Sequence, residues 1–445
     1  MNDTSTLPRR TALAIGAFAI FSAALPYLPG PRRFAGLGLD EFKLALAIPL
    51  PKAAEIREIK PEPATIAKPA PLEPLATPNL TFAPGSLQTF FAALERTGNK
   101  EPGAVTRILH YGDSPTTADS ITSDVRRLLQ GRFGDAGHGF LLIAKPWAWY
   151  GHAGMKLDGE GWQIEPASQA RAVDGFHGLG GVSFRGQAGA TSTVGLTEDH
   201  TRVIVYYVAQ PGGGDFALRS GEVQLGEVHT AADEKKPAFA EFPLGPGQRN
   251  IELRVTSGSV RLFGYRFDRG NSGVQYSSLG VNGAQVQMAL RSFEVGQWTA
   301  ALQHEDPDLV VLNYGTNESI YPEYIAKQYP EELRKVILRI RQAVPRASVL
   351  VMSPMDRGVL EGGEIVTPPA LLQLIDVQKR IAAETGCAFF NTFEAMGGAG
   401  TMGRWYHMQP RLVSADFIHP LPQGAAKVGT LFEQALLQAY ESASR

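Results

Sequence analysis

The sequence predicts an α/β protein, in which a parallel sheet flanked by helices is interrupted by an inserted β-sandwich of jelly-roll type. Two observations support this fold class. Short apolar runs alternate along the chain with stretches of helical period, which is the order of parallel strands joined by crossover helices. One connection, between residues 115 and 280, is far longer than a single crossover needs, and much of it reads as short strands separated by glycine-rich turns.

Four short apolar runs are the predicted strands of the parallel sheet. They cover residues 107–111, 308–313, 348–352 and 388–391. The predicted helices lie at residues 330–344, 368–385 and 422–442. In an open parallel sheet the chemistry gathers beyond the carboxyl ends of the strands, so the residues that follow these strands are the candidates for a functional site.

The charge balance and the single cysteine limit the possible functions. The chain has 42 lysine and arginine residues against 44 aspartate and glutamate residues, a formal net charge of -2. This balance gives no electrostatic case for nucleic acid as the main partner, and it suits a neutral or weakly charged substrate. Cys387 is the sole cysteine, which excludes an intramolecular disulfide and argues against a cysteine-based metal site.

The N-terminal segment predicts export. Arg9 and Arg10 precede an uncharged, mostly apolar run over residues 11–28, the pattern of a signal peptide or membrane anchor at 1–30. The basic pair would stay in the cytoplasm, which places the rest of the chain in the periplasm, anchored in the inner membrane or released. The alternative is a buried N-terminal helix. Residues 31–85, rich in proline and alanine, are predicted to form a semi-extended linker.

Ser114 follows the first predicted strand in a strand-to-helix turn. The segment reads Gly112-Asp113-Ser114-Pro115, and a helical pattern follows that Gly131 is expected to end. Pro115 suits the first helical position, and the free N–H groups at a helix N-terminus favour an oxyanion. The place is suitable for a nucleophile, but a serine there could equally be an ordinary helix N-cap.

A second candidate element is the segment 414–420, just before the last predicted helix. An aspartate and a histidine three residues apart can meet within one loop, where the carboxylate orients the imidazole. His419 could then accept the proton of Ser114, and Asp416 would stabilise the imidazolium. Taken alone, the same pattern fits an ordinary polar loop.

Together these segments resemble the SGNH hydrolase family, also called GDSL-like esterases. The family's four blocks are matched, in the family's order, by residues 112–115, 280–284, 315–318 and 416–419. The resemblance implies a three-layer α/β/α core with a parallel sheet, and a serine esterase that forms an acyl-enzyme and needs no metal or cofactor. The sequence departs from the family at Pro115, where a leucine is usual, and at Glu318, where an aspartate is common.

The resemblance also implies a role for each matched residue. Ser114 would be the nucleophile, and His419 and Asp416 would complete its catalytic triad. The backbone N–H groups of Ser114 and Gly283, with the side-chain amide of Asn317, would form the oxyanion hole. One such donor is typically worth about 3–4 kcal/mol of barrier.

The insert has the pattern of a β-domain. Its clearest predicted strands are residues 203–208, 250–255 and 260–267. The insert resembles the jelly-roll domain of periplasmic peptidoglycan O-acetyl esterases within the SGNH family. The predicted division is therefore a catalytic core at 86–146 and 271–445, with a β-rich insert at 147–270.

Other side chains near the insert allow further interpretations. Exposed aromatic residues could stack on sugar rings, although such residues more often belong to a core or an interface; the candidates are Trp147, Trp149, Tyr150 and Trp162. Three histidines lack the tight spacing of a metal site, namely His138, His152 and His177. Residues 404–407 could line a substrate cleft.

The expected function is that of an exported carbohydrate esterase, which removes O-acetyl groups from peptidoglycan or another cell-envelope or extracellular polysaccharide. A polysaccharide O-acetyltransferase with the same triad is an alternative, because a sugar hydroxyl can replace water as the acceptor of the acyl group. A glycan-binding protein with an inactive core is the non-enzymatic alternative.

Overall fold

The computed structural model describes residues 79–169 and 174–443. The predicted signal peptide or anchor at 1–30 lies outside the described residues, as does most of the predicted linker at 31–85. The described end of that linker includes strand β1 (Leu80–Thr81), which pairs with strand β18 of the core. Within the described ranges, no helix is both long and apolar enough to cross a membrane.

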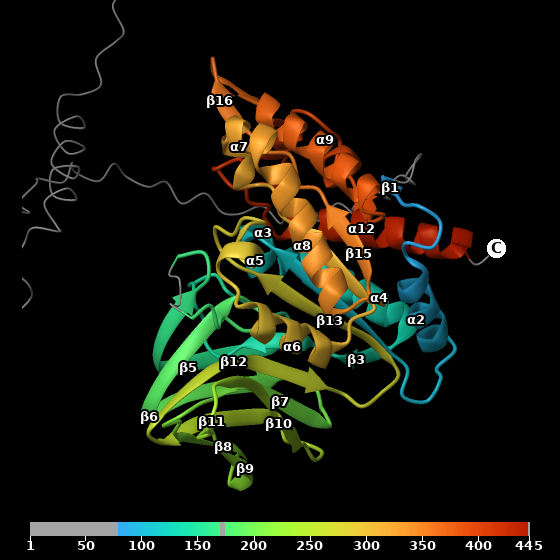
Figure 1. Ribbon diagram of the computed structural model, residues 1–445. Helices are drawn as coiled ribbons and strands as arrows, with labels where there is room; N and C mark the ends of the chain where they lie inside the picture. The colour runs from blue at the N-terminus through green and yellow to red at the C-terminus, as the bar shows by residue number, and fades with distance from the viewer. Residues whose placement is uncertain (1–78, 170–173, 444–445) are drawn as a thin grey trace, which may run out of the picture. The chain divides into compact units, whose positions relative to one another are not determined.

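The core is a seven-stranded sheet with the strand order β1-β18-β15-β14-β2-β13-β3 (Figure 1). All its pairings are parallel except that of β1 with β18. Its other strands are β2 (Val105–Gly112), β3 (Asp135–Gly137), β13 (Gly273–Gly280), β14 (Leu309–Asn313), β15 (Ser348–Met352) and β18 (Ala388–Phe390). The predicted parallel sheet is confirmed.

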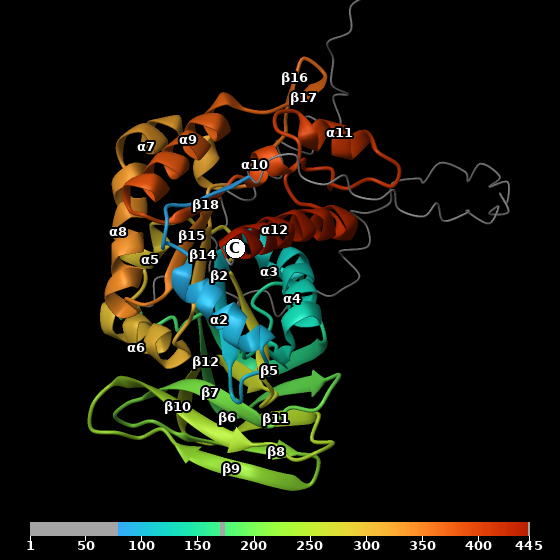
Figure 2. The same ribbon diagram turned by 90° about the vertical axis from the view of Figure 1, so that its right-hand side faces the viewer.

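Helices cover both faces of this sheet (Figure 2). One face packs against α2 (Gln88–Gly98), α4 (Ser120–Phe133) and α12 (Pro422–Ala443), the other against α6 (Val295–Glu305), α8 (Tyr329–Ala343) and α9 (Pro369–Glu384). Leu309 and Val311 of β14 belong to the hydrophobic cluster on the first face. Val310 and Leu312 belong to the cluster on the second. A strand that is apolar on both faces fits between two helical layers, and the three-layer core is confirmed.

The helical stretch behind β2 differs from the prediction. It is broken into α3 (Ser114–Thr117) and α4, with Asp119 between them in the left-handed conformation at φ 56°. Gly131 does not end α4, which continues to Gly134, where φ is 99°. A glycine inside a helix costs only about 1 kcal/mol, whereas a positive φ strongly favours glycine, so Gly134 marks the end of the helix.

The insert forms a nine-stranded antiparallel sheet, in the lower part of Figure 1. Seven strands follow the order β10-β7-β12-β6-β11-β8-β9, while β4 pairs with β12 and β5 with β6. The strands are β4 (Gly139–Leu142), β5 (Met155–Pro166), β6 (Val182–Leu196), β7 (Arg202–Ala209), β8 (Asp215–Ser220), β9 (Val223–His229), β10 (Lys236–Pro243), β11 (Asn250–Ser257) and β12 (Ser259–Asp268). The arrangement agrees with an inserted β-sandwich, and β4 joins it although β4 precedes residue 147.

The insert and the catalytic core share one hydrophobic cluster. Phe140 and Tyr206 of the insert's sheet belong to it together with Leu279 of β13 and Trp298 of α6. All four side chains are buried. Because removing apolar surface from water is the main stabilising contribution to folding, the insert and the core stabilise one another.

Candidate active site

Ser114 stands at the carboxyl end of β2, which lies between β14 and β13 in the core sheet. The strand ends at Gly112, where a Cβ atom would lie 2.2 Å from the Oγ1 of Thr116, so the tight turn requires glycine. Asp113 occupies the N-cap position of α3. The hydroxyl of Ser114 is therefore not an N-cap, and it bonds to His419 instead.

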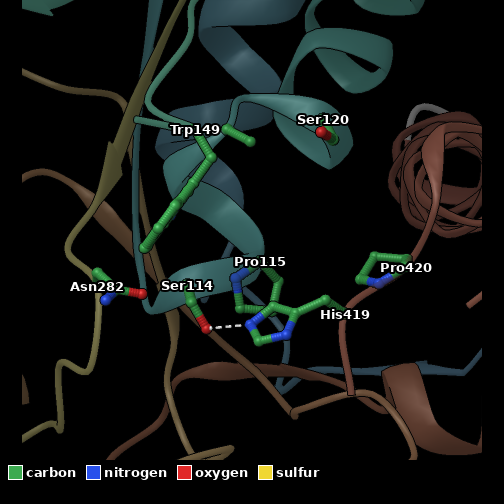
Figure 3. A pocket seen from close by; sticks show the side chains of 8 residues that line it. Ser114, Pro115, Ser120, Trp149, Asn282, His419 and Pro420 are labelled. Carbon is green, nitrogen blue, oxygen red and sulfur yellow. Dashed lines mark hydrogen bonds between the residues drawn. The ribbon is translucent and has the colours of Figure 1, made fainter. Parts of the chain in front are cut away.

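Ser114, His419 and Asp416 form a continuous hydrogen-bonded chain. The Oγ of Ser114 lies 2.7 Å from the Nε2 of His419 (Figure 3), and the Nδ1 of His419 lies 2.6 Å from the Oδ2 of Asp416. In this arrangement the imidazole can accept the serine proton, while the carboxylate fixes the ring and stabilises its charged form. The structure thus brings these three residues together, and their catalytic role stays a prediction.

The loop that carries His419 is shaped by Asp416. Its Oδ1 accepts hydrogen bonds from the backbone N–H groups of Ile418 and His419, at 2.9 and 3.0 Å, and from the hydroxyl of Ser414. Partial burial would raise the pKa of Asp416, but the hydrogen bonds from Ser414 and His419 hold it well below its usual range. The carboxylate is therefore ionised at neutral pH and can orient the imidazole.

Asn317 contacts the glycine segment that is predicted to complete the oxyanion hole. Its Nδ2 donates to the carbonyl oxygen of Ala284 at 2.8 Å. The preceding Gly283 has a φ of 71°, a conformation that favours glycine. A side-chain amide has two hydrogens, so the bond to Ala284 leaves one for a substrate. The role of Gly283 and Asn317 as oxyanion donors stays a prediction.

The serine and histidine open into a cavity of about 430 Å³, a size typical of small-ligand sites (Figure 3). It is lined by Ser114, Pro115, Ala118, Ser120, Trp149, Asn282, His419 and Pro420. Gly283 lines a second cavity of about 220 Å³. Residues 404–407, predicted as candidates for the cleft, lie in α11 (Thr401–His407) and line neither cavity. The sequence analysis assigned no role to Ser120, which belongs to no motif, or to Asn282, which lies inside the matched block 280–284.

Two buried carboxyl groups lie next to the site. Glu318 is fully buried, and its Oε1 accepts a hydrogen bond from the backbone N–H of Val286 at 2.7 Å. Burial raises the pKa of Glu318 to about 8 and that of Asp113 to about 7. Glu318, where the family commonly has aspartate, therefore fixes the segment after Gly283 through a carboxyl group that is largely protonated at neutral pH.

The histidines singled out in the sequence make structural contacts. The Nδ1 of His152 lies 2.8 Å from the Oδ2 of Asp119, and the Nδ1 of His138 lies 3.2 Å from a fourth histidine, His200. His177 bonds to a backbone carbonyl oxygen of β5. In the part of the chain that the structure describes, no group of three His, Cys, Asp or Glu side chains could hold a metal ion.

One of the four candidate aromatic residues faces the site. Trp147 and Tyr150 are buried. Trp162 is half-buried, and its Nε1 donates to a backbone carbonyl oxygen of β6 at 2.7 Å. Trp149 is 54% exposed and lines the same cavity as Ser114. Only Trp149 is therefore placed to contact a ligand of this cavity.

Residues 245–427 match the model of the GDSL-like Lipase/Acylhydrolase family. The matched segment contains Gly283, Asn317, Asp416 and His419, whereas Ser114 lies before it, on the other side of the insert. No curated protein sequence matches the chain.

Solved structures of esterases are similar to the chain. A peptidoglycan O-acetylesterase matches with a TM-score of 0.71 and 21% identity, over 82% of this chain and 99% of that chain. The likeness therefore includes the insert as well as the core. The acetylxylan esterase Axe2 from Geobacillus stearothermophilus matches over 37% of this chain and 73% of that chain at 19% identity, and its TM-score of 0.28 is too low to support an argument.

Proposed function

Because residues 245–427 match the model of the GDSL-like lipase/acylhydrolase family, we propose that this SGNH-type esterase removes O-acetyl groups from a cell-envelope or extracellular polysaccharide. The observation that carries the proposal is the hydrogen-bonded chain from Ser114 through His419 to Asp416. The acetyl group, the glycan and a location outside the cytoplasm are the parts that go beyond family membership.

The proposed reaction has two steps. The Oγ of Ser114 attacks the ester carbonyl carbon while the Nε2 of His419 accepts the serine proton. The bond between the carbonyl carbon and the sugar oxygen then breaks, and His419 returns the proton to the departing sugar hydroxyl. Water next attacks the acetyl carbon and gives a proton to His419. The bond between this carbon and the Oγ of Ser114 then breaks, and His419 gives the proton to the Oγ, which releases acetate and restores Ser114. Asp416 stays ionised and stabilises the imidazolium.

The negative charge that develops on the carbonyl oxygen requires hydrogen-bond donors. In the proposal these are the backbone N–H groups of Ser114 and Gly283 and the amide of Asn317. Asn317 and Glu318 both bond to the segment 284–286, directly after Gly283. This double attachment supports a donor that is fixed before the substrate binds, as electrostatic stabilisation of a transition state requires.

Three observations support an exported glycan esterase. The structure similar over 82% of the chain is that of a peptidoglycan O-acetylesterase. The cavity has an exposed tryptophan, and among the described residues no Lys, Arg, Asp or Glu side chain lines it, which suits a neutral ester. The apolar run behind Arg9 and Arg10 supports a signal peptide or an inner-membrane anchor, with the catalytic part in the periplasm.

Acetate release tests the proposal. The purified full-length protein is expected to hydrolyse 4-nitrophenyl acetate and to release acetate from acetylated peptidoglycan or acetylated xylan, and Ser114→Ala is expected to abolish both activities. A fluorophosphonate probe should label Ser114 in the wild-type protein alone. A folded wild-type protein that releases no acetate from any acetylated glycan would contradict the proposal.

The acceptor of the acetyl group needs its own measurement. The acetyl-serine could be resolved by a sugar hydroxyl instead of water. If water is the acceptor, as we propose, incubation with an acetyl donor and an unacetylated glycan should yield free acetate and no acetylated glycan. Formation of the acetylated glycan would assign the protein as an O-acetyltransferase.

A further inference from the structure

We propose that Trp149 is the stacking surface for the sugar ring that carries the ester, and that the glycan continues from there into the polar cavity beside Gly283. This inference rests on the proposed carbohydrate-esterase function and adds the residues that bind the glycan. It implies a substrate of at least two sugar units.

The backbone that carries Trp149 is anchored by the buried side chains on either side of it. Trp147 and Tyr150 are 8% and 7% exposed, whereas Trp149 between them is 54% exposed. The hydroxyl of Tyr150 accepts a hydrogen bond from the backbone N–H of Leu142, in β4, at 3.0 Å. A large aromatic side chain presented by buried neighbours loses little conformational freedom when a ligand covers it.

A buried ionic cluster fixes the same loop to the turn behind the nucleophile. The Oδ2 of Asp119 lies 2.8 Å from the Nδ1 of His152 and accepts a hydrogen bond from the N–H of Ala153 at 2.9 Å. The same carboxylate pairs with Arg126. Asp119 lies between α4 and α3, the helix that begins at Ser114. The loop of Trp149 and the turn of Ser114 therefore keep a fixed relative position.

The cavity around Trp149 has the chemistry of a sugar site. Ala118 and Pro420 are apolar parts of its wall, and no Lys, Arg, Asp or Glu side chain of residues 79–169 and 174–443 lines it. One face of a pyranose ring presents C–H groups with partial positive charge, which are attracted to the electron-rich face of an indole. In Figure 3, Trp149 and Pro420 lie on opposite sides of the bonded pair Ser114 and His419. Trp149 and Ser114 line the same cavity, so a sugar stacked on Trp149 can bring its acetyl group to the serine hydroxyl.

The second cavity offers a continuation with hydrogen-bonding groups. Asn282 lines the first cavity, and the adjacent Gly283 lines the second. Polar side chains of the second cavity include Ser168, Gln285, Gln287 and Arg291. The Oε1 of Gln287 is buried without a hydrogen-bond partner in the described structure. Because an unsatisfied buried acceptor costs free energy, a turn of the Gln287 side chain that brings this oxygen to a sugar hydroxyl in the cavity would gain a hydrogen bond that the free protein lacks.

Kinetics on two esters test the role of Trp149. Ethyl acetate has the acetyl ester without a ring, and an acetylated disaccharide of the glycan adds the sugars. We expect Trp149→Ala to lower kcat/KM for the disaccharide about tenfold more than for ethyl acetate, mainly through KM, and Trp149→Phe to recover part of the loss. Trp162→Phe removes an indole outside the cavity, and this control should leave the ratio unchanged. Equal losses on the two esters in Trp149→Ala would overturn the inference.

Binding measurements separate this inference from the proposed function. Ser114→Ala is titrated calorimetrically with the disaccharide and with the corresponding monosaccharide. We expect the disaccharide to bind more tightly, Trp149→Ala in this background to weaken both about tenfold, and Gln287→Ala to weaken the disaccharide more than the monosaccharide. Trp149-dependent binding by a protein that releases no acetate would support the glycan site and refute the esterase. Acetate release with binding independent of Trp149 would refute the site and leave the esterase.

Discussion

Two of the aspartate–histidine pairs in the described structure, Asp416–His419 and Asp119–His152, have similar geometry and different surroundings. The oxygen-to-nitrogen distance is 2.6 Å in Asp416–His419 and 2.8 Å in Asp119–His152. The side chains of the first pair are 46% and 43% exposed, and the second ring nitrogen of His419 meets Ser114. The side chains of the second pair are 1% and 2% exposed, and in the described structure the Nε2 of His152 has no partner.

The difference shows that an aspartate beside a histidine does not by itself indicate catalysis. The first pair is distinguished by a hydroxyl group at the second ring nitrogen and by access to a cavity. The second pair is completed by Arg126 and joins two segments of the chain. We therefore expect the first pair to control the reaction and the second to control stability.

The largest expected effect is on the rate of ester hydrolysis. His419→Ala removes the base, and kcat should fall by about 10³- to 10⁴-fold or more, with little change in melting temperature because 43% of the side chain is already exposed. His152→Ala should lower kcat less than about tenfold and should lower the melting temperature. Rates on 4-nitrophenyl acetate and thermal denaturation measure both. Comparable losses of kcat in the two variants would remove the distinction between the pairs.

For the free energy of unfolding, the buried pair should matter more than the exposed pair. Asp119→Asn leaves the buried guanidinium of Arg126 without its counter-charge, and the free energy of unfolding should fall by about 3–5 kcal/mol. Asp416→Asn is the matched variant in the exposed pair, and it should change stability by less than about 1 kcal/mol. Urea denaturation of the two variants measures the difference. Identical unfolding midpoints would show that burial does not separate the pairs.

Another buried histidine, His110, should make the stability of the protein depend on pH in the acid range. Burial lowers the pKa of His110 from 6.5 to about 4, and its Nδ1 lies 2.7 Å from the hydroxyl of Tyr276. Between these two pKa values the unfolded chain binds the proton and the folded chain does not. The free energy of unfolding should therefore fall as the pH drops from about 6.5 to about 4, by up to about 3 kcal/mol.

Urea titrations at about pH 7 and about pH 4.5 measure this loss in the wild type and in His110→Gln. The variant should lose less stability than the wild type over the same interval. Equal losses would assign the acid sensitivity to other groups.

The opposite pH dependence is expected at Glu318, whose buried carboxyl has its pKa raised from 4.5 to about 8. The folded chain keeps this proton while the unfolded chain releases it, so the stability that the group contributes is lost as the pH rises from about 4.5 to about 8. Glu318→Gln keeps an acceptor for Val286, so it should be similar to the wild type near pH 5 and more stable at about pH 9, by up to about 5 kcal/mol. Glu323→Gln, at an exposed glutamate of α7 (Pro322–Lys327), is the control. A Glu318→Gln variant that is less stable at both pH values would contradict this account.

The core sheet and the candidate site both leave local signals in the sequence. Strands buried on both faces are continuous apolar runs, so all four predicted core strands are found close to their predicted bounds. Ser114, Asn317 and His419 stand in short motifs directly after a strand or before a helix. These motifs, taken together, predicted that Ser114 lies beside His419 and that Asn317 lies beside the segment of Gly283, and the structure has both contacts.

Features that depend on packing leave no such signal. Nothing in the sequence around Trp149 and Trp162 distinguishes a residue that contacts a ligand from one that packs against the protein. Of the two, Trp149 lines the cavity. The hydrogen bond between Asp119 and His152 joins segments that are 33 positions apart in the sequence. The helix is broken at Asp119, where neither glycine nor proline predicts a break. Ser120 lines the cavity although it belongs to no motif. Long-range side-chain contacts of this kind require the three-dimensional fold.

The site also has a consequence for protein synthesis. Ser114 and His419 are 305 positions apart, and β2 is paired with β13, which follows the entire insert in the chain. On the ribosome the nucleophile emerges early, and the residue that activates it emerges after nearly all the rest. A polypeptide that terminates before His419 would contain the serine without its base. Esterase activity would therefore first arise when translation has passed His419 and both ends of the site have met.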